Sequence, residues 1–281
     1  MLLSFILPLR PETQAELPAN LHQATHAWFL DRVRALDHHL EARLHQAHVE
    51  KPFTISNLLT LQPPRQNLLH LSPQDITGIR ITSYDPELSA FLEQKFIPTL
   101  PERVFLQQTP FGREEVITRP QQTKVRAWQP WVGRDAFEAL WAQVQRKEDL
   151  PETFRLHFAS PTVFRSQGQL LPLPLPRLIF EGLARRWNQY APILHIHPGV
   201  RAFSEQALTP DSFRLHTEVV RYREGKRGAG RFSGFVGTCT FRFTRPERYW
   251  QEMILVLAAF ARYAGVGRNT ARGMGQCRLM A

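Results

Sequence analysis

Long hydrophobic runs are missing from this sequence, and no stretch approaches the roughly 20 apolar residues that a membrane-spanning helix needs. The apolar start, Met1 to Leu9, is short, has no basic leader, contains Pro8 and is followed by no small-residue cleavage site. It therefore fails as a signal peptide and reads instead as a first β-strand. We expect a protein without a membrane span, and the cytoplasm is the simplest compartment.

Cysteine is also scarce, since the chain contains only Cys239 and Cys277. These two residues could pair, but they cannot form a disulfide framework. Cysteine and histidine are not clustered at the spacing of metal ligands, which argues against a structural zinc ion. We expect neither a metal nor a cofactor.

Acidic residues are outnumbered, with 25 Asp and Glu against 35 Lys and Arg, for a formal net charge of +10. This excess favours nucleic acid as the partner, because each phosphate that is neutralised releases counterions. An anionic membrane surface is the competing partner. The 281 residues, 43% of them hydrophobic, are enough for two small globular domains.

Periodicity in the first half predicts the βαββαβ element order of a ferredoxin-like unit. Asn20 and Asp37 precede the first two helices as expected N-caps, because their side chains accept hydrogen bonds from first-turn N–H groups. The expected elements lie at residues 1–9, 21–36, 38–45, 51–59, 68–71, 76–83, 86–96, 104–108 and 116–128.

The second half predicts the same order again, after an amphipathic connecting helix at 133–147. Its expected elements lie at residues 153–159, 177–189, 213–223, 232–243, 250–264 and 277–280. The boundary is expected at Glu148 to Pro151, which gives domains 1–148 and 149–281. The predicted fold class is α+β, and the duplication rests on element order because no residue-level repeat is visible.

Two glycine pairs near the C-terminus, Gly265 with Gly267 and Gly273 with Gly275, enclose a polar stretch. Glycine lets backbone N–H groups turn outward toward a ligand, and arginine side chains form forked contacts with phosphate oxygens. A polyanion therefore suits this loop, whose polar members are Arg268, Asn269, Thr270 and Arg272. The loop fits neither a dinucleotide fingerprint nor a phosphate-binding P-loop. A turn that merely ends a helix remains the alternative.

A second basic stretch, residues 221–231, is rich in glycine and lies between two expected strands. Its cations favour contact with a phosphate backbone, although an exposed hairpin tip is the simpler reading. The predicted RNA-binding residues here are Arg223, Lys226, Arg227 and Arg231.

His45 is expected at a helix end, and Lys51 follows it at the start of an extended run. A base that titrates near neutrality beside a fixed cation is what phosphodiester transesterification requires. One group takes the proton from an attacking 2′-hydroxyl, while the other stabilises the phosphate. Most single histidines are ordinary surface or core residues, so spacing alone makes this one hypothesis among others.

Four segments together resemble one family. The loop from Gly265 to Gly275 resembles the C-terminal glycine-rich loop of the CRISPR-associated repeat-processing endoribonucleases, members of the RAMP superfamily. Residues 17–23, the segment from Leu44 to Ser56, and residues 160–165 with 186–188 resemble further motifs of that family, in the same order. The resemblance spans almost the whole chain.

This resemblance implies two tandem ferredoxin-like (RRM-like) domains facing each other across a cleft that holds CRISPR repeat RNA. It implies metal-independent cleavage of the precursor transcript within each repeat, leaving a 5′-hydroxyl and a 2′,3′-cyclic phosphate or 3′-phosphate. His45 matches the family's catalytic histidine and Lys51 its frequent catalytic lysine. A homodimer and association with other CRISPR-associated proteins both remain open.

The chain departs from the family pattern at one point. Some members carry a tyrosine in the first helix, whereas the comparable spacing here falls at Leu30 or Asp31. His26 is the predicted substitute and the third catalytic residue, with His22 as an alternative. A non-cleaving RNA-binding subunit of the same superfamily is the second functional hypothesis, and an unrelated basic protein of tandem RRM-like domains is the third.

Overall fold

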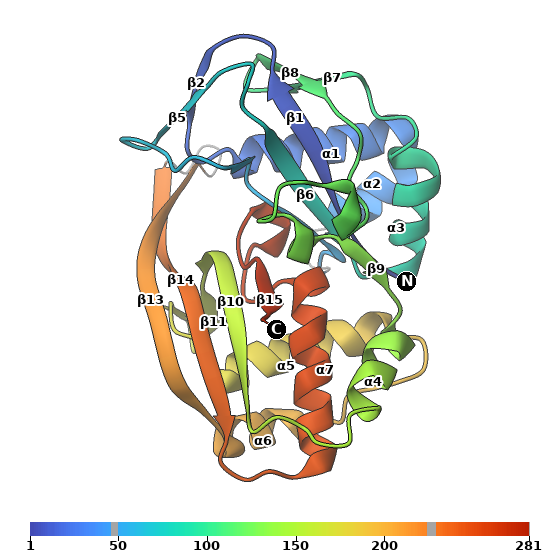
Figure 1. Ribbon diagram of the computed structural model, residues 1–281, viewed down its shortest axis with the longest axis vertical. Helices are drawn as coiled ribbons and strands as arrows, with labels where there is room; N and C mark the ends of the chain where they lie inside the picture. The colour runs from blue at the N-terminus through green and yellow to red at the C-terminus, as the bar shows by residue number, and fades with distance from the viewer. Residues whose placement is uncertain (46–49, 224–228, 281) are drawn as a thin grey trace. The chain divides into compact units, whose positions relative to one another are not determined.

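The computed structural model describes residues 1–45, 50–223 and 229–280, which form two compact units. The first unit comprises Met1–Arg134 with Ala271–Gly273, and the second comprises Asp135–Thr270 with Met274–Ala281. Their helices and strands carry the labels of Figure 1. The units divide between Arg134 and Asp135, and the domain boundary expected at residues 148 and 149 stays a prediction.

The first unit is built on an antiparallel sheet in the order β3-β6-β1-β8-β7. The four strands of the predicted βαββαβ unit are, in chain order, β1, β3, β6 and β8. In the sheet, the first of these strands lies between the third and the fourth, which is the ferredoxin-like arrangement. The elements are β1 (Leu2–Pro11), α1 (His22–Leu36), α2 (His38–His45), β3 (Phe53–Ile55), β6 (Thr77–Ser83), α3 (Pro86–Phe91), β7 (Arg103–Leu106) and β8 (Thr109–Arg113).

Smaller elements decorate this unit. The strand β4 (Leu59–Thr60) pairs with β6, while β2 (Ala15–Pro18) and β5 (Leu68–Leu71) form a two-stranded sheet of their own. After α3 the chain continues as one π-helical turn, Leu92–Phe96. The strand β9 (Gly133–Asp135) then leads to α4 (Phe137–Gln145).

Side chains of β1 alternate between two buried clusters, because successive residues of a strand point to opposite faces. Phe5 packs in the main core with Phe29 of α1, whereas Ile6 packs with Ile117 and Trp128. Each such side chain contributes roughly 1.5–3 kcal/mol on full burial. The sheet therefore has apolar cover on both faces.

The strand predicted at 116–128 is wrong. That segment contains a 3-10 turn at Pro120–Gln122 and pairs with β1 only through an isolated bridge at Ile117. Its apolar residues cover a face of the sheet instead of extending it, and Pro120 has no N–H group to donate to a ladder. The place of the last strand is taken by β8.

The two predicted helix caps have different outcomes. The Asp37 side chain accepts a 2.9 Å hydrogen bond from the Leu40 N–H, so that cap is confirmed. Asn20 is not the N-cap residue of α1, which is Leu21, but its Oδ1 accepts a 3.4 Å hydrogen bond from the first-turn N–H of His22, as expected of the side chain. The Leu21 N–H donates instead to Oδ1 of Asn57, at 2.8 Å.

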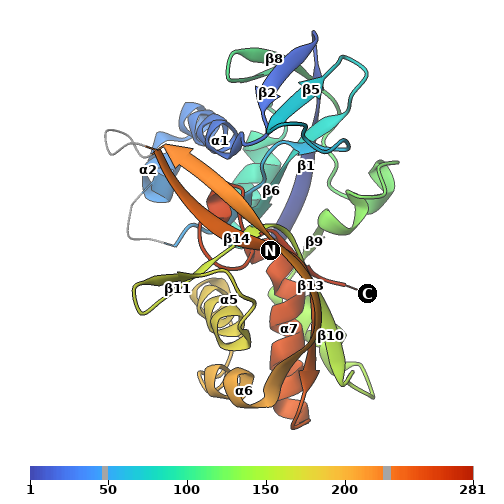
Figure 2. The same cartoon turned by 90° about the vertical axis from the view of Figure 1, so that its left-hand side faces the viewer.

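The second unit has a four-stranded sheet in the order β13-β14-β10-β15, which is again the ferredoxin-like order. Helices α5 and α7 lie on the same side of this sheet in both views (Figures 1 and 2). The elements are β10 (Thr153–Thr162), β11 (Phe164–Ser166), β12 (Gln169–Leu171), α5 (Pro176–Tyr190), α6 (Val200–Ala207), β13 (Leu208–Arg223), β14 (Ala229–Phe243), α7 (Arg248–Ala264) and β15 (Cys277–Leu279).

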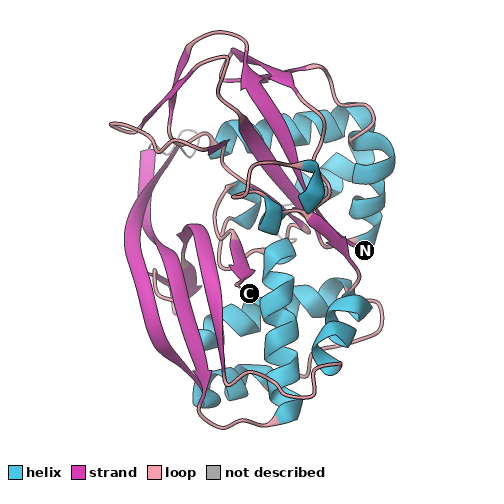
Figure 3. Ribbon diagram, in the orientation of Figure 1, coloured by secondary structure: helices cyan, strands magenta, loops and turns pink. Residues whose placement is uncertain are grey.

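Both predicted ferredoxin-like units are thus confirmed, with helices and strands mixed throughout (Figure 3). Helix α6, which packs Val200 and Phe203 into the interior, was not predicted from the sequence. Among the described helices, none combines the length and apolarity that crossing a membrane requires.

Candidate active site and glycine-rich loop

The first unit gathers the predicted catalytic residues. Because α1 places His22 and His26 four residues apart, they share one helix face. His45 is the last residue of α2, and Lys51 stands two residues before β3. Arg272 joins them from the glycine-rich loop, since Ala271–Gly273 belongs to this unit.

His26 is half-buried, and its Nδ1 lies 2.7 Å from the carbonyl oxygen of Ala271. Its ring stacks on Phe53, with 6.2 Å between the ring centroids. Burial lowers the pKa of His26 to about 4, and the positive charges of Arg272, Lys51 and His45 act in the same direction. His26 is therefore neutral at physiological pH.

His22 is more deeply buried, at 9% exposure, and its Nδ1 is bonded to Oδ1 of Asn20. Burial lowers the pKa of His22, and Arg272 lowers it further. The loop backbone passes close by, because a Cβ on Gly273 would lie 2.9 Å from Cβ of His22. His22 is thus enclosed between α1 and the loop.

Lys51 contacts the end of α2 at Leu44. The Lys51 ammonium donates a hydrogen bond to the Leu44 carbonyl, next to His45 in the chain. Partial burial lowers the pKa of Lys51, and Arg272 adds to the effect. His45 itself is exposed, so its ring is open to a substrate. The catalytic roles of His45, Lys51 and His26 stay predictions.

The glycines of the loop serve its internal packing. The N–H groups of Gly265, Gly273 and Gly275 donate to the carbonyls of Ala261, Ile55 and Pro161. A Cβ on Gly275 would lie 2.0 Å from the Val266 oxygen, and φ at Gly275 is +65°. The expectation that the glycine N–H groups turn outward is therefore wrong for these three residues.

The side chains that this loop exposes are those of Arg268, Asn269 and Arg272, whereas Thr270 is buried. The Arg268 N–H donates to the Val163 carbonyl at 3.0 Å, which anchors the backbone and leaves the guanidinium outside. RNA binding by the loop, its glycines included, stays a prediction.

Arg186 is a residue whose role sequence reasoning missed. Only 6% exposed, it donates from Nη1 to the carbonyls of Ala264 and Gly265, at 3.1 and 2.7 Å, and from Nη2 to that of Gly267, at 2.8 Å. A helix C-terminus leaves carbonyls without partners and favours a cation. Arg186 fixes the loop to the end of α7. The only indication of this residue in the sequence was that residues 186–188 resemble a family motif.

The strands that enter and leave the basic stretch 221–231 pair with each other from Leu208 and Phe243 to Arg223 and Ala229, and residues 224–228 lie outside the described residues. Figure 2 shows β13 and β14 as a long twisted ribbon. Arg231 is exposed, whereas Lys226, Arg227 and the side chain of Arg223 lie outside the described residues. Their contact with phosphate stays a prediction.

No group of three or more histidine, cysteine or acidic residues within the described ranges could hold a metal ion. Cys239 and Cys277 are free and buried, and burial raises the pKa of the Cys239 thiol to about 12.

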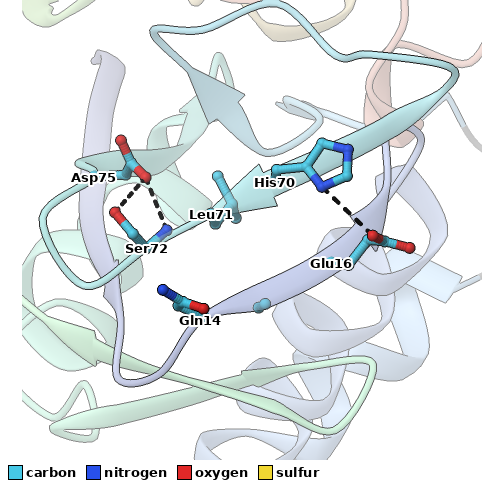
Figure 4. Close-up of a pocket in the computed structure, with 7 residues that line it drawn as sticks. Gln14, Glu16, His70, Leu71, Ser72 and Asp75 are labelled. Carbon is cyan, nitrogen blue, oxygen red and sulfur yellow. Dashed lines mark hydrogen bonds and ion pairs between the residues drawn. The ribbon is translucent and has the colours of Figure 1, made fainter.

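A pocket beside β2 and β5 contains none of the predicted site residues (Figure 4). There His70 Nδ1 lies 3.4 Å from a Glu16 carboxylate oxygen, and the Asp75 carboxylate accepts two bonds of 2.8 Å from Ser72. Four of the polar residues that line it are thus paired with one another.

Comparison with known proteins points to one family. Residues 1–141 match the family model for the CRISPR Cas6 N-terminal domain, and residues 156–277 match that for the CRISPR-associated endoribonuclease Cas6. A curated Cas6 endoribonuclease of Mycobacterium tuberculosis is 30% identical over 131 residues, 46% of this chain and 40% of that protein. One of Streptococcus thermophilus is 26% identical over 141 residues, 49% of this chain and 54% of that protein. The matched segments thus span about half of these relatives or less.

Solved structures match over the full length. A product complex of Cas6 from Thermus thermophilus is 26% identical, with a TM-score of 0.77 and complete coverage of both chains. A Cas6 in complex with a substrate mimic is 25% identical, with a TM-score of 0.71 and 99% coverage of each chain.

Proposed function

The chain belongs to the CRISPR-associated endoribonuclease Cas6 family, and we propose on that premise that it cleaves CRISPR precursor RNA within the repeats to give guide RNAs. The observation that carries this proposal is the match of two Cas6 family models in tandem, over residues 1–141 and 156–277. Solved Cas6 structures with product and with a substrate mimic support RNA as the ligand. We place the protein in the cytoplasm, with the precursor transcript.

The cleavage proceeds without a metal ion. The 2′-hydroxyl before the scissile bond loses its proton to a base and attacks the phosphorus, and the bond from phosphorus to the 5′ oxygen breaks. The leaving 5′ oxygen takes up a proton, which gives a 5′-hydroxyl and a 2′,3′-cyclic phosphate, or a 3′-phosphate after hydrolysis. His45, His26 and Lys51 supply proton transfer and charge stabilisation. The bond from Lys51 to the Leu44 carbonyl supports this, because it holds the ammonium at the backbone of the residue that precedes His45.

RNA is held by exposed cations. Arg268 and Arg272 present guanidinium groups from a loop whose backbone is committed to internal hydrogen bonds. This rigid loop backbone keeps the forked guanidinium donors in place for phosphate oxygens at low entropic cost. The exposed Arg231 extends the basic surface along the hairpin.

The test is cleavage of the host's own repeat RNA, labelled at its 5′ end, in excess chelator. We expect cutting at one position, and we expect a single 2′-deoxy substitution before the scissile bond to abolish it while binding survives. His45→Ala should reduce the rate by about 10²–10⁴-fold. His39→Ala, which removes an exposed histidine of the same helix, is the matched control.

Dependence on Mg²⁺, or normal cutting by His45→Ala, would remove the mechanism. A tight complex whose RNA stays intact at neutral pH would identify a non-cleaving RNA-binding subunit instead.

A further inference from the structure

The contact between His26 and Ala271 joins residues 245 positions apart in the chain, and it fixes a proton. A carbonyl oxygen only accepts hydrogen bonds, so at 2.7 Å the Nδ1 of His26 must carry the hydrogen. A neutral imidazole has one N–H group. The second nitrogen, Nε2, is therefore bare and is a proton acceptor.

The Ala271 carbonyl is itself held in place. The Gly273 N–H donates to the Ile55 carbonyl at 2.8 Å, and Gly273 forms a parallel bridge with Ser56 after β3. Ala271 is only 6% exposed, within the 3-10 turn Thr270–Arg272. Ala271–Gly273 is thus held in the first unit by the end of a 3-10 turn and one bridge to Ser56.

The imidazole ring is restrained from its other side as well. Phe53 stacks on it with only 19° between the ring planes. With one ring nitrogen bonded and one ring face covered, rotation of the side chain would lose both contacts. A base held in this way needs little reorganisation before it reacts.

We propose that Ala271–Gly273 is a positioning element for catalysis, in which the Ala271 carbonyl holds the Nδ1 proton of His26 and presents Nε2 as the general base for the 2′-hydroxyl. The assignment rests on the proposed endoribonuclease function. In the step, Nε2 takes the 2′-hydroxyl proton as the new bond to phosphorus forms, and His45 gives a proton to the 5′ oxygen as the old bond breaks.

The charges around His26 support its role as the base and that of His45 as the acid. Arg272 from the loop, Lys51 before β3 and His45 from α2 act on His26 together with burial, and His22 lies on its own helix. A histidine with a pKa of about 4 is not protonated at neutral pH and cannot begin the reaction as the acid. An RNA phosphate on Arg272 would offset the strongest of these charges and raise the pKa of His26, which strengthens the base when substrate is bound.

The first test measures the tautomer and the pKa of His26 in the absence of RNA, by ¹⁵N NMR of the full chain. The His26 signal is assigned by its loss in His26→Gln. We expect an Nδ1–H tautomer at pH 7. In Arg272→Ala the pKa of His26 should rise, because the charge of Arg272 lowers it, whereas in Arg268→Ala, which removes another exposed cation of the same loop, it should stay unchanged. A proton on Nε2, or no difference between the two variants, overturns the inference.

The second test uses cleavage. His26→Gln should lower the single-turnover rate by about 10²–10⁴-fold with unchanged RNA affinity. In Arg272→Ala at saturating RNA, the acid limb of the pH–rate profile should move toward neutrality relative to Arg268→Ala. Normal cutting by His26→Gln would refute His26 as the base and leave the endoribonuclease standing. Absence of cutting by the unmodified chain would refute the proposed function, while the tautomer measurement would still report on the positioning.

Discussion

The guanidinium of Arg186 donates a 2.8 Å hydrogen bond to the carbonyl oxygen of Gly267, although the two residues are 81 positions apart. Two further bonds reach Ala264 and Gly265, so one buried cation serves three carbonyls at the end of α7. The backbone at the start of the glycine-rich loop is therefore held in place by Arg186, within the second unit.

Replacement of Arg186 by methionine should lower the free energy of unfolding by more than about 3 kcal/mol, because three buried carbonyls lose a charged donor. Urea denaturation of the full chain measures this. Arg146→Met is the matched control, since Arg146 is an exposed arginine at the end of α4, and it should change stability by no more than about 0.5 kcal/mol. Equal losses in both variants would contradict the role given to Arg186.

Local patterns in the sequence were enough to predict the element order. The short apolar run of β1 and the apolar face of α7 are read from neighbours within a few residues, and they contributed to the prediction of both ferredoxin-like units. The segment 116–128 failed for a physical reason. Its apolar residues are buried as in a strand, but the burial comes from covering the sheet, which no local period reveals.

The candidate site was predictable in its residue types and not in its contacts. His45 and Lys51 are close in sequence, so their proximity could be expected. The bond from His26 to Ala271 depends on where the chain's last turn docks, and that is decided by tertiary packing. Reading the loop glycines as outward-facing donors failed because their N–H groups pair with distant carbonyls.

Glycine at position 275 should be indispensable to the loop. Its φ of +65° disfavours any L side chain, and an added Cβ would lie 2.0 Å from the Val266 oxygen, so Gly275→Ala should cost at least about 2 kcal/mol. Gly182→Ala is the control, because Gly182 lies within α5 and an added Cβ meets nothing within 4 Å. This second change should stabilise the chain by up to about 1 kcal/mol. Thermal denaturation of both variants checks the opposite signs.

Arg268→Ala should weaken repeat-RNA binding and also flatten its dependence on salt. Each lost phosphate contact removes about 0.7–0.9 from the slope of log affinity against log salt concentration. Filter binding between low and physiological salt, under conditions that block cleavage, gives the slope. Arg146→Ala, an exposed cation at the end of α4 outside the predicted RNA-binding set, should leave the slope unchanged. If Arg268→Ala kept the full slope of log affinity against log salt concentration, the loop would be only a turn that ends a helix.

Stability of the full chain should fall as the pH drops from 7 to about 4.5, and His26 should account for much of the loss. Its pKa is about 4 in the folded protein and about 6.5 when unfolded, so the unfolded chain binds the extra proton in this window. The stabilisation is complete above the unfolded pKa and is lost toward the folded one, on the order of 2–3 kcal/mol. Urea midpoints across this range measure it. His26→Gln should flatten the curve, whereas His39→Gln, at an exposed site, should keep it, and equal curves for the two variants would show that His26 is not the group responsible. The paired carboxylates Glu41 and Asp211 have lowered pKa values and titrate below this window, whereas burial also lowers the pKa values of His22 and His157, whose contribution persists in His26→Gln.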